Sequence, residues 1–534
     1  MVEITGDQSE VFAFLGERAT HGLPPGARVR RIDTHGAAVF LAGPDVYKVK
    51  RAARFPFMDF STLEKRRSAC DNEILVNRDN APELYLGTVA IRRGPHGLQL
   101  DGSVTGGEIV EWAVHMRRFD EEATLDHIAA RGELRPDTIT KLADIVFAAH
   151  QRAPRRGDDA AAMFRLRLVE TLDGLAAAPN VFAAAAVAEL RQACLAAMTA
   201  AESLLTKRAA QGKVRRCHGD LHLRNIVLIK GAPLLFDAIE FDDSFATCDI
   251  LYDLAFLVMD LWQRGLEHHA NLLLNYYLHR CDPEEEEMAG LAAMPLFLAL
   301  RAAIRARVTG HLLALAGGGQ DGLLQEARHF FAAARLFLAP RPVQLVAVGG
   351  FSGSGKSTMA QRLAAAIGRP PGAVHARSDS ERKKMFGVGE FERLPEDAYR
   401  PEVSRAVYER LRHLADTALR AGQSVIVDAV HAKPEERAAI AAVAARHDAP
   451  FTGLWLDAPA ATLVARVGAR GLDVSDADAA VVEAQLQRPL GPLTWTRLDA
   501  GAPLDSLARD ALRHIADAGA AVPPAASVSG QVSG

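Results

Sequence analysis

One stretch decides the fold of the second half of this chain: Gly350-Phe351-Ser352-Gly353-Ser354-Gly355-Lys356-Ser357. It matches the pattern G-x-x-x-x-G-K-[ST], in which glycines let backbone N–H groups turn toward phosphate oxygens. In this pattern Lys356 reaches the β- and γ-phosphates, and the hydroxyl of Ser357 binds Mg²⁺. We therefore expect residues 350–358, which end at Thr358, to bind a nucleoside triphosphate.

The residues on either side support the motif. Residues 343–348 predict a short buried strand, and residues 356–367 predict a helix that ends at Gly368. A strand, a loop and a helix in this order direct the helix N-terminus at the anion. The alternative, a glycine-rich turn with a lysine by chance, does not account for the strand and the helix.

A second phosphotransfer signature lies in the first half of the chain, at His218-Gly219-Asp220-Leu221-His222-Leu223-Arg224-Asn225. Asp220 and Asn225 are five residues apart, as in the catalytic loop of protein kinases. Two apolar runs follow within residues 226–236 and predict a hairpin with its turn at residues 230–233.

The predicted hairpin returns Asp237 to the end where Asn225 lies. We therefore expect Asn225 and Asp237 to hold one metal ion, and Asp220 to face the acceptor hydroxyl. Acidic and amide groups converging on one point are costly without a cation, which favours a Mg²⁺–nucleotide site.

These residues resemble the aminoglycoside phosphotransferase family, which has a protein-kinase-like two-lobed fold and carries H-G-D-x-H-x-x-N before a metal-binding aspartate. Upstream, Lys48 lies on a predicted strand, and the capping box Ser61-Thr62-Leu63-Glu64 opens a helix to about residue 78. The resemblance implies that Glu73 on this helix pairs with Lys48, and that both serve the nucleotide. Lys50 on the same strand face competes for this role, and a solvated strand residue is the alternative for Lys48.

Further matches and departures lie on both sides of the loop. Asp249 and Asp253 fit the family's D-x-x-x-D-L-A helix, in which Asp253 would brace the catalytic loop and Asp249 is alternatively a helix cap. The only candidate turn over the nucleotide, at residues 34–38, lacks G-x-G-x-x-G, and Ala238-Ile239-Glu240 follows Asp237 in place of Phe-Gly. These departures keep open an ATP-binding domain without transfer.

The second half alternates predicted strands and helices, with strands at 343–348, 373–376, 424–427 and 452–456. This order predicts an α/β fold with a doubly wound parallel sheet. Asp428 follows one strand at the sheet edge where such folds bind ligands, so it is a candidate for holding Mg²⁺ through water; a turn cap is the alternative.

The segment Ser378-Asp379-Ser380-Glu381-Arg382-Lys383-Lys384 resembles the S-D-x-x-R-K segment of small P-loop kinases of the gluconate kinase, zeta-toxin and polynucleotide kinase group. The resemblance implies that Asp379 accepts the proton of the substrate hydroxyl and that Arg382 binds an anionic substrate. Arg466 and Arg470 are four residues apart, as on a lid helix whose guanidiniums offset phosphate charge. Surface arginines on a solvated face are the alternative.

Composition is typical of a cytoplasmic enzyme with no membrane or nucleic-acid partner. A chain of 534 residues is too long for a single hydrophobic core, so we expect more than one domain. Its net charge of −4 gives no general attraction to nucleic acid or membrane. The five cysteines form no C-x-x-C pair, the N-terminus is unlike a signal peptide, and the longest apolar stretch, 288–300, is too short to span a bilayer.

Breakers and periodicity divide the chain. We expect a kinase-like N-lobe at 1–118, a mainly helical C-lobe at 119–338, a P-loop kinase domain at 343–520 and a disordered tail at 521–534. Pro340 and Pro342 mark the linker. The acidic run 282–287 is expected to start a helix, with its proline at the first helical position.

The order of the two resemblances is that of a known bacterial fusion of an aminoglycoside phosphotransferase-like domain with a P-loop kinase-like domain. It implies two modules that use ATP and Mg²⁺ to phosphorylate hydroxyl groups of sugar-like or related metabolites. One alternative is a nucleic-acid 5′-kinase or repair module, against which stand the negative charge and an aromatic content of only 6%. The other is a regulatory protein with one ATP-binding domain that does not transfer phosphate. The sequence leaves both acceptors and the oligomeric state open.

Overall fold

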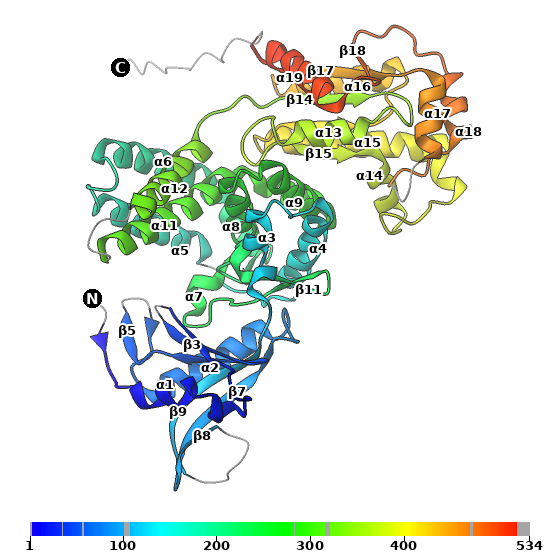
Figure 1. Cartoon of the computed structure of the whole chain (residues 1–534). Coiled ribbons are helices and arrows are strands. Elements are labelled where there is room, and N and C mark those ends of the chain that lie inside the picture. The colour runs from blue at the N-terminus through cyan, green and yellow to red at the C-terminus, as the bar shows by residue number, and fades with distance from the viewer. Residues whose placement is uncertain are drawn as a thin grey trace, which may run out of the picture. The chain divides into compact units, whose positions relative to one another are not determined.

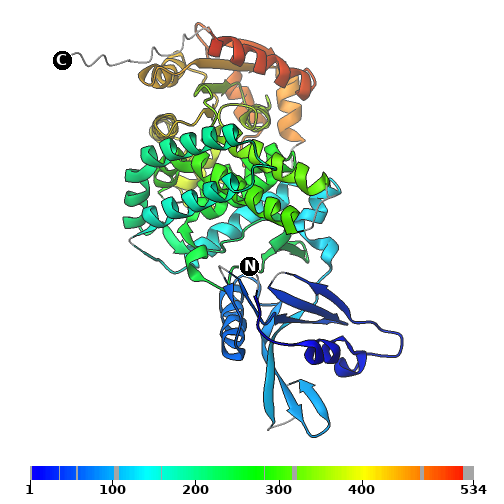
Figure 2. The same cartoon turned by 90° about the vertical axis from the view of Figure 1, so that its left-hand side faces the viewer.

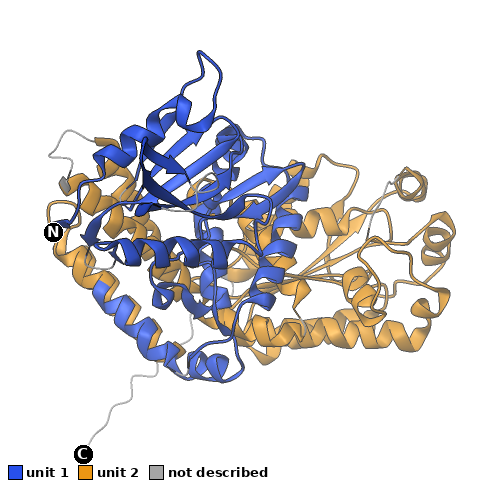
Figure 3. Ribbon diagram, turned by 90° about the horizontal axis from the view of Figure 1, so that it is seen from below, with its two compact units in different colours: residues 1–170, 202–261 blue, residues 171–201, 262–534 orange. Residues whose placement is uncertain are grey.

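The computed structural model describes residues 3–34, 36–55, 58–100, 107–157, 159–281, 283–315, 321–469 and 474–520. The predicted disordered tail at 521–534 therefore lies outside the described residues. The chain forms two compact units (Figure 3). Unit 1 comprises Met1–Glu170 and Glu202–Leu261, and unit 2 comprises Thr171–Ala201 and Trp262–Gly534.

Unit 1 begins with a six-stranded antiparallel sheet of order β2-β3-β4-β9-β7-β8. Its strands are β2 Arg30–Asp33, β3 Ala37–Ala42, β4 Asp45–Lys50, β7 Tyr85–Gly94, β8 Gly97–Leu100 and β9 Glu108–Arg117. Helix α2, Leu63–Asn77, lies against β7 and β9 (Figure 1). A small sheet of β1 Glu3–Ile4, β5 Ala53–Phe55 and β6 Met58–Asp59 completes this part.

Both faces of the large sheet are covered because its apolar residues alternate. Cys70 and Ile74 of α2 pack in one cluster with Val114, while Val11 and Leu15 of helix α1, Ser9–Gly16, pack in another. One prediction about α2 is wrong. Its N-cap is Thr62, whose hydroxyl accepts from the Lys65 N–H, so the expected box from Ser61 does not form.

The rest of unit 1 is helical around two short antiparallel pairs. The helices are α3 Leu125–Ala130, α4 Pro136–Arg152, the first part of α5 Ala160–Ala176, α7 Asp243–Ala246 and α8 Ile250–Gln263. The strand pairs are β10 Val214–Arg216 with β13 Thr247–Asp249, and β11 Ile226–Ile229 with β12 Ala232–Leu235. The predicted hairpin β11–β12 is confirmed, but its turn has only two residues, Lys230 and Gly231, with φ of 50° and 79°. A two-residue turn with positive φ at both positions matches the twist of the two strands that it joins.

Unit 2 contains a parallel five-stranded sheet of order β15-β16-β14-β17-β18, which confirms the predicted fold class. The strands are β14 Leu345–Gly349, β15 Val374–Arg377, β16 Val425–Asp428, β17 Phe451–Asp457 and β18 Thr496–Asp499. Strand β18 was not among the predicted strands, because only one of its four residues, Leu498, is buried.

Helices cover both faces of this sheet. α13 Lys356–Ala364 and α19 Leu504–Ala520 pack on one face, and α15 Pro401–Arg420 and α16 Pro434–Arg446 contact the strands from the other. Three further helices lie between strands in the chain: α14 Ser378–Met385, α17 Ala460–Gly468 and α18 Ala479–Leu486. Helix α13 ends earlier than the predicted residue 367.

Unit 2 also holds part of α6 Ala184–Ala210 and the helices α9 Glu267–Arg280, α10 Glu284–Gly290, α11 Met294–Leu315 and α12 Asp321–Leu338. The long helices α11 and α12 lie side by side (Figure 2). Contacts thus group residues 262–338 with the parallel sheet, while the predicted domain boundaries along the chain stay predictions. Pro283 is the N-cap of α10, not its first helical residue as predicted.

Within the described residues, one helical segment, Glu284–Ala314, is long and apolar enough to cross a membrane by length and composition. Its most apolar window is 83% buried inside the protein, as is usual for a core helix.

Candidate active sites

The loop between β10 and β11 carries the predicted catalytic residues of unit 1. Gly219 has φ of 83°, and a Cβ there would meet Ala246 at 3.1 Å, so the chain turns where only glycine fits. Asp253 of α8 accepts hydrogen bonds from the N–H groups of His218, at 3.2 Å, and Gly219, at 2.9 Å. Asp253 therefore braces the loop, as the resemblance implies.

Asp220 and Asn225 lie together at the end of this loop. The Asn225 amide Nδ2 donates to the backbone oxygen and to Oδ2 of Asp220, both at 2.9 Å. Nε2 of His222 lies 3.2 Å from the same Oδ2. The Asp220 side chain is 41% exposed, so a fixed carboxylate faces solvent where an acceptor could reach it.

Lys48, Glu73 and Asp237 meet in one ion-pair cluster, although they lie on β4, α2 and the segment after β12. Nζ of Lys48 is 2.8 Å from Oε1 of Glu73 and 2.5 Å from Oδ1 of Asp237. Burial would lower the pKa of Lys48, but these carboxylates outweigh burial and raise it well above its usual value. The predicted pairing of Lys48 with Glu73 is present.

Lys50 completes the cluster from the other side. It is 1% exposed, its Nζ is 2.5 Å from Oε2 of Glu73, and it also forms an ion pair with Glu240. Burial would raise the pKa of Glu73, but the ammonium groups of Lys48 and Lys50 outweigh burial and lower that pKa to about 2. Both candidate lysines thus bind Glu73, and of the two only Lys48 also has an ion pair with Asp237 among the described residues.

Two further side chains fix the segment that carries Asp237. Asp237 has φ of 60°, its N–H donates to the Tyr85 hydroxyl at 3.0 Å, and the Ala238 N–H donates to Oδ1 of Asn77 at 2.9 Å. Sequence reasoning missed Tyr85 and Asn77. A signal for Asn77 existed, because it lies one helical turn after Glu73, on the same face of α2.

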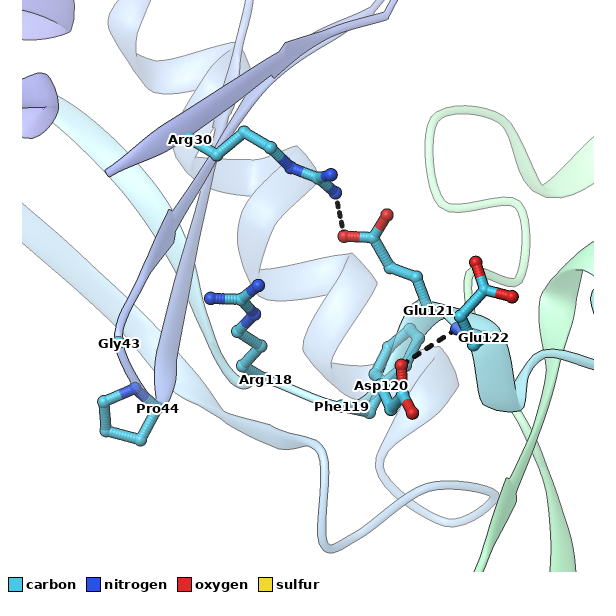
Figure 4. A pocket seen from close by; sticks show the side chains of 8 residues that line it. All are labelled: Arg30, Gly43, Pro44, Arg118, Phe119, Asp120, Glu121 and Glu122. Carbon is cyan, nitrogen blue, oxygen red and sulfur yellow. Dashed lines mark hydrogen bonds and ion pairs between the residues drawn. The ribbon is translucent and has the colours of Figure 1, made fainter. Parts of the chain in front are cut away.

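A pocket of about 470 Å³ opens beside the segment after β9 (Figure 4). Its lining is charged, with Arg30 directed at Glu121, and with Arg118 and Asp120 nearby. An adenine ring needs apolar faces. Phe119 also lines the pocket, but its ring packs with that of Phe236, at a centroid distance of 5.0 Å, against a neighbouring apolar cluster that suits this purpose better.

In unit 2 the loop between β14 and α13 has the backbone that its glycines require. Gly350, Gly353 and Gly355 have φ of 140°, 85° and 89°. A Cβ at Gly350 would meet the Leu456 carbonyl oxygen at 2.7 Å, and one at Gly353 would meet that of Leu463 at 2.6 Å. Gly355 is the N-cap of α13, so Lys356 and Ser357 open the helix as predicted.

A glutamine that sequence reasoning missed holds this loop from outside. Oε1 of Gln485, on α18, accepts from the Ser352 N–H at 2.8 Å, and its Nε2 donates to the Ser352 hydroxyl at 3.1 Å. Nζ of Lys356 donates to the Phe351 carbonyl oxygen at 3.2 Å. Contacts within the protein therefore hold the phosphate-binding loop in its conformation.

Buried polar atoms gather at the carboxyl ends of β15 and β16. Oδ2 of Asp428, Nε2 of His375 and both ring nitrogens of His431 are buried and have no hydrogen-bond partner among the described residues. His375 Nε2 lies 3.6 Å from Asp428 Oδ2. An unpartnered buried polar group costs about 1–3 kcal/mol, so such a set fits a site built for a polar ligand.

The ionisation of these groups is shifted. Burial would raise the pKa of Asp428, but His375 and Lys356 outweigh burial and help to lower it to about 2. Burial lowers the pKa of His431 to about 3. At neutral pH the site thus holds an anionic carboxylate beside a neutral imidazole.

Two family models match parts of this chain. Residues 95–308 match the family described as the phosphotransferase enzyme family, and residues 345–490 match the family described as the AAA domain. The chain joins a phosphotransferase segment to a P-loop segment. The predicted fusion is therefore confirmed, and its two kinase-like segments support ATP binding and phosphotransfer.

One relative is similar over most of the chain, and solved structures are similar to parts of it. An uncharacterized protein of Mycobacterium tuberculosis (strain H37Rv) is 28% identical over 482 residues, which cover 88% of this chain and 92% of that protein. A sugar kinase from Janibacter sp. HTCC2649 matches 34% of this chain and 100% of its own, at 24% identity and a TM-score of 0.25. A choline/ethanolamine kinase family protein from Mesorhizobium loti matches 60% and 94%, at 14% identity and a TM-score of 0.36.

The predicted acceptor residues of the P-loop segment lie on α14. Asp379 is in its first turn, and Arg382 is mostly buried, with Nη1 donating to the Ala398 carbonyl oxygen at 2.5 Å and its guanidinium 5.1 Å from the Tyr399 ring centroid. Arg382 therefore has a structural partner, and its binding of an anionic substrate stays a prediction.

The predicted lid arginines of the P-loop segment are placed differently. Nη2 of Arg466 donates to the Ala500 carbonyl oxygen at 2.9 Å, so this guanidinium is bound at the end of β18. Arg470 lies outside the described residues. A role for either at phosphate stays a prediction.

Proposed function

We propose that this chain is an ATP- and Mg²⁺-dependent phosphotransferase with two active sites, each transferring the γ-phosphate to a hydroxyl group of a small molecule. The observation that carries the proposal is the ion-pair cluster of unit 1. Lys48 lies 25 residues from Glu73 and 189 from Asp237 in the chain, yet its Nζ contacts both carboxylates. Active kinases need an ion pair between such a lysine and a helix glutamate, together with an aspartate placed to bind Mg²⁺.

The residues present fit a bound Mg²⁺–nucleotide in each unit. In unit 1, Asn225 and Asp237 would hold the metal, Lys48 would contact phosphate, and Asp220 would orient the acceptor hydroxyl and accept its proton. When bound, Mg²⁺ would offset the charge on the phosphate oxygens. The segment therefore has a residue for each part of phosphoryl transfer, despite the missing glycine pattern at residues 34–38.

In unit 2, Ser357 and Asp428 would hold the metal, and Lys356 with the loop N–H groups would bind phosphates. The unpartnered buried atoms of Asp428, His375 and His431 support a polar ligand at this edge of the sheet. Asp379 would orient the acceptor hydroxyl, while Arg382, Arg466 and Arg470 would bind anionic groups.

We further propose a small polar metabolite as each acceptor and the cytoplasm as the location. A sheet edge with one carboxylate and one guanidinium suits a molecule with a hydroxyl and an anionic group. All five cysteines are buried and free, as in proteins of a reducing compartment.

The test uses the full chain in four forms: unaltered, Asp220→Asn, Lys356→Ala and the double variant. Each form is screened against a panel of sugars and related hydroxyl compounds for ATP-dependent phosphorylation. We expect each single variant to lose one acceptor activity by about 10²–10⁴-fold and keep the other, because each loss removes one site's catalytic group. The double variant should lose both.

Lys230→Ala is the matched control, because this lysine side chain is 84% exposed in the hairpin turn. A Lys356→Ala protein that keeps every activity would contradict the P-loop assignment. An Asp220→Asn protein that keeps every activity would instead favour a unit 1 that binds ATP without transferring phosphate.

A further inference from the structure

The outer edge of β15 is covered by a helix. The Val374 N–H donates to the Ser424 oxygen, toward β16, at 2.9 Å. Successive residues of a strand point their backbone groups to opposite sides, so Ala373 and His375 face away from β16. Their backbone groups meet two asparagines of α9, Asn271 and Asn275.

The amide of Asn275 pairs with this edge as a neighbouring strand would. Its Oδ1 accepts from the His375 N–H at 2.8 Å, and its Nδ2 donates to the Ala373 oxygen at 3.2 Å. Asn271, one turn earlier, donates to the same Ala373 oxygen at 3.0 Å, but no contact with His375 is found for it among the described residues. The two asparagines thus share one anchor point and differ in the second.

The position of His375 matters because its ring reaches the candidate metal carboxylate. Nε2 of His375 is 3.6 Å from Oδ2 of Asp428, and both atoms are buried without a hydrogen-bond partner in the part of the chain that the structure describes. A small shift of the β15 backbone would change this separation directly.

The far end of α9 is fastened to the same part of the sheet. Nζ of Lys384, on α14, donates to the carbonyl oxygens of His279, at 3.1 Å, and Cys281, at 2.8 Å. It also bonds Oε2 of Glu284 at 3.0 Å. Helix α9 therefore contacts β15, which carries His375, and its C-terminal end contacts α14, which carries Asp379.

We propose that Asn275 is a positioning residue of the P-loop site: it fixes the backbone of His375 and thereby sets the imidazole beside Asp428. This rests on the proposed function of the P-loop segment as a Mg²⁺–ATP site. A helix outside the P-loop segment thus completes its site.

The test compares Asn275→Ala with Asn271→Ala in the full chain, in an Asp237→Ala background that weakens the nucleotide site of unit 1. Two quantities are measured: the melting temperature without nucleotide, and the affinity for a fluorescent ATP analogue with and without Mg²⁺. Lys356→Ala in the same background gives the signal from nucleotide bound elsewhere.

We expect both asparagine variants to melt at a lower temperature, because each loses a bond to Ala373. Only Asn275→Ala should reduce the Mg²⁺-dependent gain in affinity, by about tenfold, as loss of a residue that orients a metal ligand does. His375→Gln should reduce it similarly, and the double variant should be no worse than His375→Gln alone, because both act through one imidazole.

Equal Mg²⁺-dependent gains for Asn271→Ala and Asn275→Ala would overturn the proposal, as would additive losses in the double variant. If Asn275→Ala does not fold, Asn275→Asp replaces it, since it keeps the acceptor for the His375 N–H and loses the donor to Ala373. That variant should melt at a lower temperature and keep its Mg²⁺-dependent gain; loss of the gain would count against the proposal. An unaltered signal in Lys356→Ala would contradict the P-loop assignment itself.

Discussion

Lys48 and Lys50 lie two positions apart on one strand, yet their contacts indicate different roles. Both contact Glu73, but Lys50 is 1% exposed and turns to Glu240, whereas Lys48 is 16% exposed and reaches Asp237. Glu73 is fully buried, so removing either cation leaves a less compensated buried charge. Lys50 thus holds the glutamate, and Lys48 remains accessible to a ligand.

Asp220 and Asp237 should fail in different ways when substituted. We expect Asp220→Asn to keep Mg²⁺–ATP affinity and lose transfer, because Asp220, which contacts Asn225 and His222, is the proposed carboxylate for the acceptor hydroxyl. Asp237→Ala should weaken metal–nucleotide binding, because it removes a proposed metal ligand. Titration calorimetry on the Lys356→Ala chain separates the two. The site is not a kinase site if both variants bind and transfer as before.

His431 makes the stability of unit 2 depend on pH. Its pKa falls from an ordinary 6.5 to about 3 in the folded protein, so between these values the unfolded chain binds the proton more tightly. Folding therefore loses stability as the pH falls below about 6.5. We expect His431→Gln to shrink the drop in melting temperature between pH 7 and pH 5, while the exposed His514→Gln leaves it unchanged. Equal drops in all three proteins would contradict the shift.

At the scale of elements, the phosphate loop is held between two helices. The Gly353 Cα faces the Leu463 carbonyl of α17, and Gln485 of α18 bonds Ser352. Phe351 packs with Leu463 and Val482 in one apolar cluster. Any substitution that pushes α17 away from this loop should therefore distort the phosphate-binding loop.

Gly353→Ala tests this arrangement. The added Cβ would lie 2.6 Å from the Leu463 oxygen at φ of 85°, and the left-handed backbone alone costs roughly 1–2 kcal/mol. We expect ATP affinity at the P-loop to fall by about tenfold or more. Gly468→Ala on α17 is the control, since no atom of the described residues lies within 4 Å of a Cβ built there, and this variant should bind ATP normally. Unchanged affinity in Gly353→Ala would mean that the loop adapts freely.

The edge of β15 gives a second element-scale prediction. A fragment of residues 340–534 lacks α9, so the His375 N–H loses its partner, while the Val374 N–H keeps the Ser424 oxygen of β16. We expect the His375 amide to exchange with solvent at least about tenfold faster in the fragment than in the full chain, and the Val374 amide to change little. Amide exchange by NMR measures both. Equal protection of His375 in the two proteins would show that α9 does not cover this edge.

At the scale of the whole molecule, the chain folds into two compact units, and the boundary between them does not follow the predicted linker. Residues 171–201 and 262–338 join the parallel sheet in unit 2, although sequence order attaches them to the kinase-like C-lobe. Residues 262–338 belong to unit 2 because Asn275 of α9 binds the edge strand β15, and Glu284 of α10 binds Lys384 of α14. A cut at the proline linker therefore removes part of the P-loop unit.

The sequence by itself determined what short spacings encode. The loop Gly350–Ser357, the loop His218–Asn225 and the hairpin that returns Asp237 were all predicted, because each depends on neighbours within about 20 residues. The alternation of strands and helices predicted the parallel sheet for another reason, because a crossover helix between two strands makes them parallel. The weak strand β18 was missed, because little of it is buried.

Only the tertiary structure decided which side chains meet across the chain. Lys48 and Asp237 are 189 residues apart, Ser352 and Gln485 are 133 apart, and Asn275 and His375 are 100 apart. No local periodicity encodes such pairs, because they form when separate elements pack and bury their polar groups together. That packing distinguished Lys48 from Lys50, gave Arg382 and Arg466 structural partners, and brought His375 beside Asp428.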